Sequence, residues 1–193
     1  MTLTERQQQI IDTAIKIIAN KGLKSCTIKN LSEAINISEP AIYRHFKSKE
    51  EILLTMLHHF ETVSNELLKH LQNIDLSPLE KIKAFLENRY RVFNENPDLA
   101  SVMMADDLFT ANPKLLEVRS RIIKGHRDLV IEIVSQGQQA GKIRHEIEPK
   151  QIFLIIFGSM RLLVKQWSNH PEHIDLTVEG KKLWKSIRVI IQA

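Results

Sequence analysis

Apolar residues recur at three- and four-residue intervals along almost the whole of this 193-residue chain. That spacing places them on one face of successive α-helices, whereas the every-second-residue alternation of a half-buried strand is hard to find. The chain contains six glycines and six prolines, so few residues interrupt such helices. An all-α fold is therefore predicted, with enough residues for one large domain or two small ones.

Residues that begin and end helices divide the pattern into about nine segments. A capping box at Thr4–Gln7 opens the first helix and Gly22 ends it. The apolar run Ile152–Phe157 is also compatible with a buried strand, but helical spacing continues past Met160 and favours a helix. Long helices are expected at residues 48–71, 79–94, 113 to about 141, 149–167 and 177–191, and a short helix from 97 to about 107.

Residues 27–49 predict two short helices, a tight turn and the start of a third helix. Thr27 can cap the first helix, Asn36 tolerates the left-handed conformation of a sharp turn, and Ser38 can cap the second helix. Pro40 fits the first turn of that helix, where its missing N–H has no intrahelical partner. Small, aromatic and cationic side chains then follow in one short helix, a combination suited to a DNA groove and its phosphates.

Charge and targeting signals narrow the class of protein. The net charge is +4, and the first 50 residues carry 8 Lys/Arg against 5 Asp/Glu, although an excess of three is also compatible with ordinary scatter. Cys26 is the single cysteine, no apolar signal segment follows Met1, and the uncharged run Gln151–Met160 is too short to span a bilayer. We expect a soluble cytoplasmic protein that does not insert into a membrane.

The chain shows no arrangement of residues that predicts an enzyme. It contains no Glu-x-x-His ligand pair and no paired histidines of a zinc protease, and Cys26 has no neighbouring histidine. Asp106, Asp107 and His126 could hold a cation, but adjacent acids on a helix point in different directions, so a solvated face or a helix end is the preferred interpretation. No catalytic residue, metal site or cofactor is expected.

At residues 10–49 the sequence resembles the TetR family of transcriptional regulators. The resemblance covers about the first 55 residues by motif and the later helices only by number and length. It implies a three-helix helix-turn-helix DNA-binding domain at residues 1–50, joined through a long helix to a helical ligand-binding and dimerisation domain at residues 51–193. Asn36 stands where many members have glycine, and Glu39-Pro40 stands where many carry a basic or small residue, which leaves the operator sequence open.

The resemblance and the side-chain chemistry together suggest which residues contact DNA. For Tyr43, packing in the small domain is the alternative to a phosphate contact, whereas for Phe46 packing in the core is preferred. Residues that can bind phosphate are Tyr43, His45 and Lys49, helped by Thr27 and Ser38. Residues that can reach base edges are Glu39, Pro40, Ala41 and Arg44.

The resemblance also implies a ligand pocket and a dimer. Aromatic and methionine residues gather in the middle helices, although such stripes form a core more often than a pocket. The candidates for lining a pocket are Phe85, Tyr90, Phe93, Met103, Met104, Phe109 and Trp167. The last two helices have broad apolar faces that would form a homodimer interface and set two recognition helices ~34 Å apart.

These features predict a repressor that occupies a palindromic operator in double-stranded DNA. A small-molecule inducer, apolar or amphipathic, would release it by binding the two conformations unequally. Two alternatives stay open: a DNA-binding protein of the same fold that is controlled by protein partners without an inducer, and a helical interaction protein that ignores DNA. A large empty pocket would favour the inducer, and a filled core the partner-controlled form.

Overall fold

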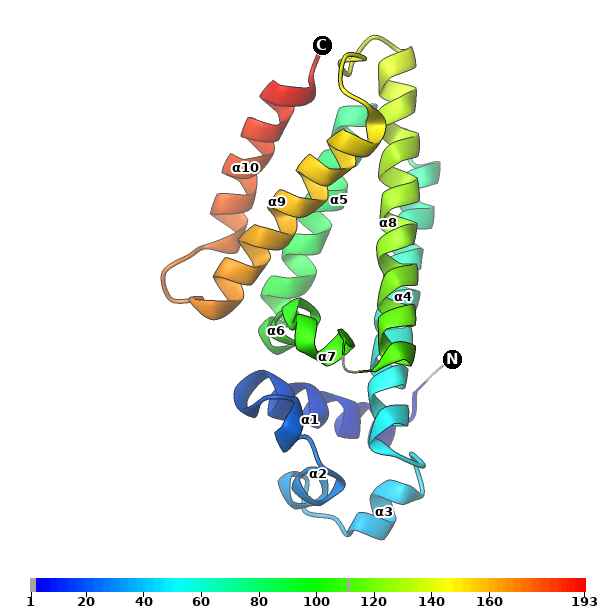
Figure 1. Cartoon of the computed structure of the whole chain (residues 1–193), viewed down its shortest axis with the longest axis vertical. Helices are drawn as coiled ribbons and strands as arrows, with labels where there is room; N and C mark the ends of the chain where they lie inside the picture. The colour runs from blue at the N-terminus through cyan, green and yellow to red at the C-terminus, as the bar shows by residue number, and fades with distance from the viewer. Residues whose placement is uncertain (1–2, 111) are drawn as a thin grey trace.

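The computed structural model describes residues 3–110 and 112–193, and within them the chain forms ten α-helices and one short 3-10 turn. An isolated bridge between Ile143 and Gln192 is the only β-type pairing in those ranges. This all-helical architecture confirms the predicted fold class. The α-helices, shown in Figure 1, are α1 (Glu5–Lys21), α2 (Ile28–Ala34), α3 (Glu39–Tyr43), α4 (Lys49–Asn73), α5 (Pro78–Glu95), α6 (Pro97–Met104), α7 (Asp106–Thr110), α8 (Pro113–Gln139), α9 (Pro149–Asn169) and α10 (Leu176–Ile191).

Most of the predicted helix boundaries are found, because the capping residues act as expected. The capping box at Thr4 and Gln7 is complete, and Gly22 follows α1 with φ +77°. Thr27 accepts a hydrogen bond from the Asn30 amide, 3.1 Å, at the start of α2. Asn36 has φ +53° in the turn before α3, the left-handed conformation expected of it.

The segment after Pro97 differs from the single helix expected there. Helix α6 ends at Met104 because Ala105 has an extended backbone, and α7 begins at Asp106 as a separate short helix. This break lets Leu108 and Phe109 turn into the core, where both are fully buried. The prediction of one helix to about residue 107 is therefore wrong, and the helix count rises from nine to ten.

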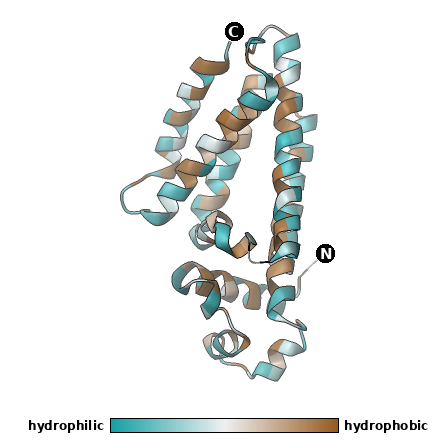
Figure 2. Cartoon of the chain, viewed as in Figure 1, coloured by the Kyte–Doolittle hydropathy of each residue, from teal (hydrophilic) through white to brown (hydrophobic). Residues whose placement is uncertain are grey.

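The molecule is elongated, with the three short helices α1–α3 at one end and a body of long helices at the other (Figure 1). Helix α4 runs from the small end into the body, where it packs along α8. Helices α5, α8, α9 and α10 form most of the body, and α6 lies between that body and α1. Apolar residues follow one side of each helix (Figure 2), and their buried side chains form one continuous core.

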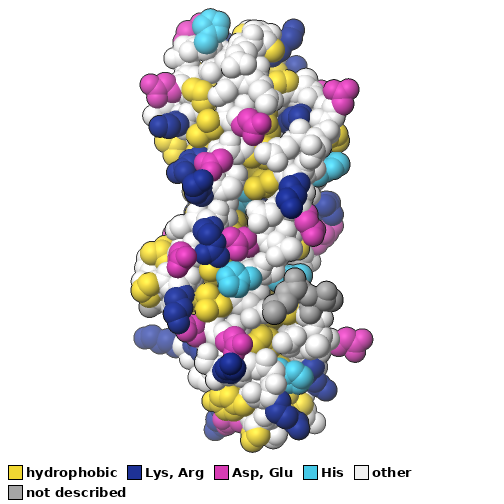
Figure 3. All heavy atoms as spheres, turned by 90° about the vertical axis from the view of Figure 1, so that its right-hand side faces the viewer, with side chains coloured by type: hydrophobic (Ala, Val, Ile, Leu, Met, Phe, Trp, Pro, Cys, Tyr) yellow, Lys and Arg dark blue, Asp and Glu magenta, His cyan; other side chains and the backbone are white. Residues whose placement is uncertain are grey.

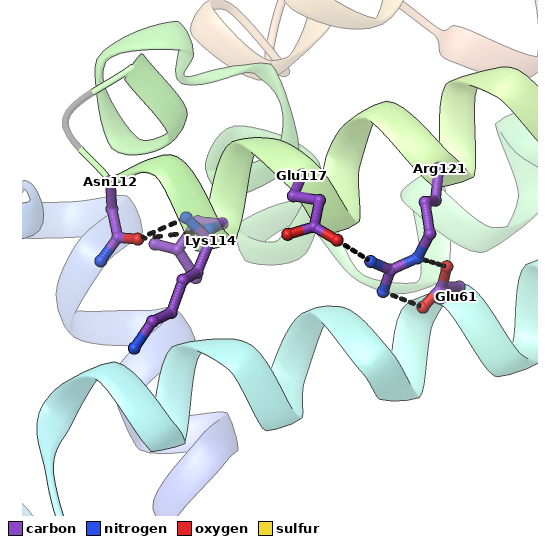
Figure 4. A network of polar contacts seen from close by, with 6 residues as sticks. Glu61, Asn112, Lys114, Glu117 and Arg121 are labelled. Carbon is purple, nitrogen blue, oxygen red and sulfur yellow. Dashed lines mark hydrogen bonds and ion pairs between the residues drawn. The ribbon is translucent and has the colours of Figure 1, made fainter.

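Ion pairs join α4 to α8 along the outside of the molecule. Arg121 of α8 donates two hydrogen bonds to Glu61 of α4, at 3.0 and 3.2 Å, and one to Glu117, at 3.2 Å (Figure 4). Nearer the small end, Glu50 accepts hydrogen bonds from Asn112 and Lys114, both at 2.9 Å. Figure 3 shows positive and negative side chains interspersed on this face. The contacts fix how α4 lies on α8, although exposed pairs of this kind contribute only about 0–1 kcal/mol each.

Among the described residues, no helix combines the length and the apolar character needed to cross a bilayer.

Candidate DNA-binding surface and ligand cavity

Helix α3 is held on the small end by two buried side chains. Ile42 is fully buried, and Phe46, just beyond the helix, is 2 % exposed and packs in the same core. The expectation that Phe46 belongs to the core is confirmed. Because these two residues face inward, the opposite side of α3 is exposed to solvent and accessible to a binding partner.

The predicted DNA-contacting residues lie together on and around that outward side. Tyr43 is 51 % exposed, so it does not complete the core, and Arg44 beside it is also exposed. Ala41 and His45 are half-buried. The remaining exposed members of the set are Thr27, Ser38, Glu39 and Pro40.

The hydroxyl groups of Thr27 and Ser38 at this surface differ in their capping hydrogen bonds. The Thr27 oxygen already accepts the capping hydrogen bond of α2, so its O–H remains able to donate. Ser38 occupies the cap position of α3 but its side chain makes no capping hydrogen bond. The predicted position of the Ser38 cap is correct, whereas the side-chain bond expected with it is not formed in the described structure.

Lys49 is half-buried at the start of α4, and its ammonium group already has one internal contact. Its Nζ donates a hydrogen bond to the Leu23 carbonyl oxygen, 2.9 Å, which ties the turn after α1 to α4. An ammonium group has three donors, so two remain for other acceptors. Ser48 caps the same helix by accepting from the Glu51 amide at 3.1 Å.

A cavity of about 40 Å³ lies in the body between α4, α5, α6, α8 and α9. This volume is much smaller than the several hundred Å³ of pockets that hold drug-sized ligands. Its apolar lining comes from Phe60, Phe93, Met103, Met104, Ile122, Ile123, Phe157 and Met160, and its polar lining from Arg89, Arg119, His126 and Arg161.

Three of the seven residues predicted to line a pocket lie at this cavity: Phe93, Met103 and Met104. The other four are buried elsewhere. Phe85 packs edge-on against the ring of His126, and the guanidinium group of Arg119 lies over the ring of Phe109, with its central carbon 4.5 Å from the ring centre.

Tyr90 and Trp167 serve packing near α10. The Tyr90 ring lies against Gly180, where an added Cβ would come within 2.6 Å of two ring atoms. Trp167 is buried at the end of α9, beside the loop that leads to α10. Neither residue lines the cavity between α4, α5, α6, α8 and α9.

A buried polar cluster that was not predicted from the sequence lies at the cavity: Arg89 and His126 line it, and Ser64 behind them contacts both. Arg89 is 2 % exposed and His126 is 4 % exposed. Burial lowers the pKa of Arg89 to about 10, so it stays charged at neutral pH. Burial, and to a lesser extent the charge of Arg89, lowers the pKa of His126 to about 3, so it stays neutral.

The interpretation of His126 as part of a solvated face or helix end is therefore wrong. A signal for its burial was present, since His126 lies four residues after Ile122 and three before Leu129 in an apolar stripe. Arg89 occupies the same kind of position between Leu86 and Phe93.

Asp106 lies beside the cavity, where it pairs with two arginines of the cavity lining. Its Oδ1 accepts hydrogen bonds from Arg119 of α8 and Arg161 of α9, both at 2.7 Å. The hydrogen bond from Arg119 is the main reason that the pKa of Asp106 lies below its usual value. Asp106 is thus paired with two arginines, and the described residues contain no cluster of ligands suited to a metal ion.

An uncovered apolar face runs along α9 and α10. Leu154, Gly158 and Leu162 follow one another at four-residue spacing on α9 and are all exposed. Val189 of α10 is 75 % exposed, and Ile190 beside it is 44 % exposed. A side chain added at Gly158 would meet nothing within 4 Å of its Cβ. These two helices therefore present to solvent an apolar surface that no other described helix covers.

Two family models together cover most of the chain. One, described as "Bacterial regulatory proteins, tetR family", matches residues 10–56, and the other, described as "YsiA-like protein, C-terminal region", matches residues 56–191. The second alone spans more than half of the sequence.

Individual proteins are also similar to this chain over most of its length. The "Fatty acid metabolism regulator protein" of Bacillus subtilis (strain 168) is 23 % identical over 175 residues, which cover 89 % of this chain and 88 % of the relative. A solved structure of the Bacillus subtilis regulator FadR in complex with stearoyl-CoA is 22 % identical, covers 93 % of this chain and 96 % of that one, and has a TM-score of 0.79. The ketosteroid regulator KstR2 of Mycobacterium tuberculosis is 16 % identical, with 100 % and 97 % coverage and a TM-score of 0.85.

Proposed function

Because this chain belongs to the TetR family of bacterial regulatory proteins and is a transcriptional regulator, we propose that it is a repressor which a small molecule releases from DNA. The observation that carries the proposal is the outward side of α3, where Tyr43 and Arg44 are exposed while Ile42 and Phe46 anchor the helix. An exposed aromatic and an exposed arginine on a short anchored helix suit a major groove and its phosphates. The protein would act in the cytoplasm, where the DNA is.

We assign the DNA contacts to residues 1–50 and the ligand and dimer contacts to residues 51–193. Tyr43, His45 and Lys49 bind phosphate, helped by the hydroxyl groups of Thr27 and Ser38. Arg44 reaches base edges from the same helix, and Glu39, Pro40 and Ala41 lie at its front. A carboxylate at Glu39 would accept a hydrogen bond from a cytosine amino group, which sets a preference at one position of each half-site.

The uncovered face of α9 and α10 supports a homodimer. A second copy would cover Leu154, Leu162 and Val189, and the space beside Gly158 allows two helices to approach closely. Two-fold symmetry would then place two α3 helices about one DNA turn, ~34 Å, apart and require a palindromic operator.

Helix α6 offers a physical connection between ligand and DNA. Its end carries Met103 and Met104 in the cavity wall, and its body packs on α1 of the small end. Phe60 lines both this cavity and the cleft of about 500 Å³ between α1 and the body. A ligand that enlarges the cavity must displace these side chains, and the displacement reaches α1.

The small volume of the cavity bears on the alternative that the protein has no inducer. Size alone would favour that form, but Arg89 and His126 each have a buried nitrogen with no partner in the described structure, and both line the cavity, which suits a ligand that supplies acceptors. The similar Bacillus subtilis regulator is known in complex with stearoyl-CoA, so a body of this shape can open around a ligand. We therefore prefer regulation by a small molecule that is apolar or amphipathic.

The proposal is tested by binding to genomic DNA fragments at several salt concentrations. Arg44→Ala should weaken binding to the preferred fragments by about 10- to 100-fold, which corresponds to about 1–3 kcal/mol for a lost base contact. Arg91→Ala is the matched control, because Arg91 is an exposed arginine of α5, outside helices α1–α3 that carry the proposed DNA contacts. Absence of DNA binding at low salt would refute the function.

A further inference from the structure

Arg89 is a buried guanidinium group that forms no ion pair with an acid among the described residues. Its Nη1 donates to Ser64 Oγ at 3.3 Å and its Nη2 donates to Asn88 Oδ1 at 2.7 Å, while Nε has no partner in the described structure. Its other neighbour is the Phe60 ring, 5.9 Å from the guanidinium carbon. A buried charge without a counter-ion is costly and is seldom kept unless something pairs with it.

The contacts of Ser64 bear on which nitrogen of His126 carries the proton. Arg89 has only donors, so Ser64 Oγ accepts its hydrogen bond, and the Ser64 O–H is free to donate to His126 Nε2, 2.6 Å away. When Ser64 donates to Nε2, neutral His126 carries its proton on Nδ1, and this atom has no partner in the described residues. In this tautomer the cluster has two unpaired N–H donors, on Arg89 and His126, and both residues line the same cavity.

The other residues that line the cavity favour a ligand with an apolar body. Phe93, Met103, Met104 and Met160 line it, and methionine side chains rearrange readily around irregular ligands. At its edge Arg119 and Arg161 share the one carboxylate of Asp106, so the region as a whole has more positive than negative charge. Both features suit a ligand with an apolar body and an anionic head.

We propose that this cavity binds an apolar carboxylate, with its carboxylate group accepting hydrogen bonds from Arg89 Nε and His126 Nδ1 and its hydrocarbon body among the methionines. The inference rests on the proposed function, because it names the class of the releasing ligand. A carboxylate supplies one negative charge and two acceptors, which match one guanidinium and two unpaired donors. A neutral ester or alcohol could accept a hydrogen bond but would leave the charge of Arg89 unbalanced.

The binding test compares acids with their neutral counterparts on the full-length protein. Dodecanoate, as an aliphatic probe, and phenylbutyrate, as an aromatic probe, are titrated by calorimetry beside the methyl ester of each. At least one acid should bind about tenfold or more tightly than its ester, as expected for hydrogen bonds to a charged group. Equal affinity of acid and ester, or no binding of either acid, would overturn the inference.

Two substitutions on α5 test the role of Arg89. Arg89→Met should abolish the preference for the acid, whereas the exposed control Arg91→Met should keep it. Arg89→Met should also leave the melting temperature of the ligand-free protein unchanged or higher, because replacing a buried unpaired charge by an apolar side chain of similar volume is often neutral or stabilising. A preference retained in Arg89→Met, or a large fall in its melting temperature, would assign Arg89 a structural role instead.

DNA binding measured in the same samples separates this inference from the proposed function. If the protein binds DNA but shows no preference for acids, only the ligand class is wrong. If an acid binds through Arg89 but does not release DNA, the carboxylate site stands and the inducer mechanism fails.

Discussion

The burial of His126 predicts that the protein loses stability when the pH falls from 7 to 5. The pKa of the imidazole is about 3 in the folded chain, against an ordinary value of 6.5 in the unfolded chain. At pH values between these two pKa values, the unfolded chain binds a proton that the folded chain does not. The free energy of unfolding therefore rises with pH over this range. Between pH 7 and pH 5 this single group should contribute a loss of about 2 kcal/mol.

The measurement is chemical denaturation of the wild type and His126→Phe at both pH values and the same protein concentration. Phenylalanine fits a site already bordered by the rings of Phe85 and Phe157, and it cannot be protonated. The fall in the free energy of unfolding should be about 2 kcal/mol larger for the wild type than for the variant. Equal falls would show that His126 is protonated in the folded protein, and would refute its burial as a neutral group.

Three further substitutions test packing, assembly and DNA contact. Gly180→Ala should destabilise the fold by about 1–2 kcal/mol, because its Cβ would meet the Tyr90 ring, and this cost should disappear in a Tyr90→Leu background. Leu154→Glu should convert the proposed dimer to a monomer in sedimentation at micromolar concentration, whereas the same change at exposed Leu116 of α8 should not. Lys49→Ala should weaken binding to every DNA sequence and flatten its salt dependence by about one unit of slope at most; an unchanged slope would remove Lys49 from the phosphate contacts.

The fold could be predicted largely from the sequence because its helices are marked by local signals. Apolar spacing, the capping box at Thr4 and the turn residue Asn36 each act within one or two turns of chain. The same holds for α3, where the alternation of inward Ile42 and Phe46 with outward Tyr43 and Arg44 follows from helix geometry.

The ligand cavity could not be predicted in the same way, because it depends on how five helices meet. A stripe of Phe and Met residues has the same sequence spacing whether it fills a core or borders a cavity. For this reason Phe85 and Phe109 were predicted to line the pocket, whereas in the structure they are buried away from the cavity. Arg89 and His126 come together only through the packing of α5 against α8. The break at Ala105 likewise depends on the burial of side chains in α7 rather than on a breaker residue.

Selection of bound fragments from random DNA tests the central claim most directly, because it examines the α3 surface, the dimer and the function in one measurement. The recovered sequences should share an inverted repeat whose half-sites are centred about one helical turn, ~34 Å, or a multiple of it apart. Fragments without a shared sequence, or with a single unpaired half-site, would contradict a dimeric repressor that reads DNA through α3.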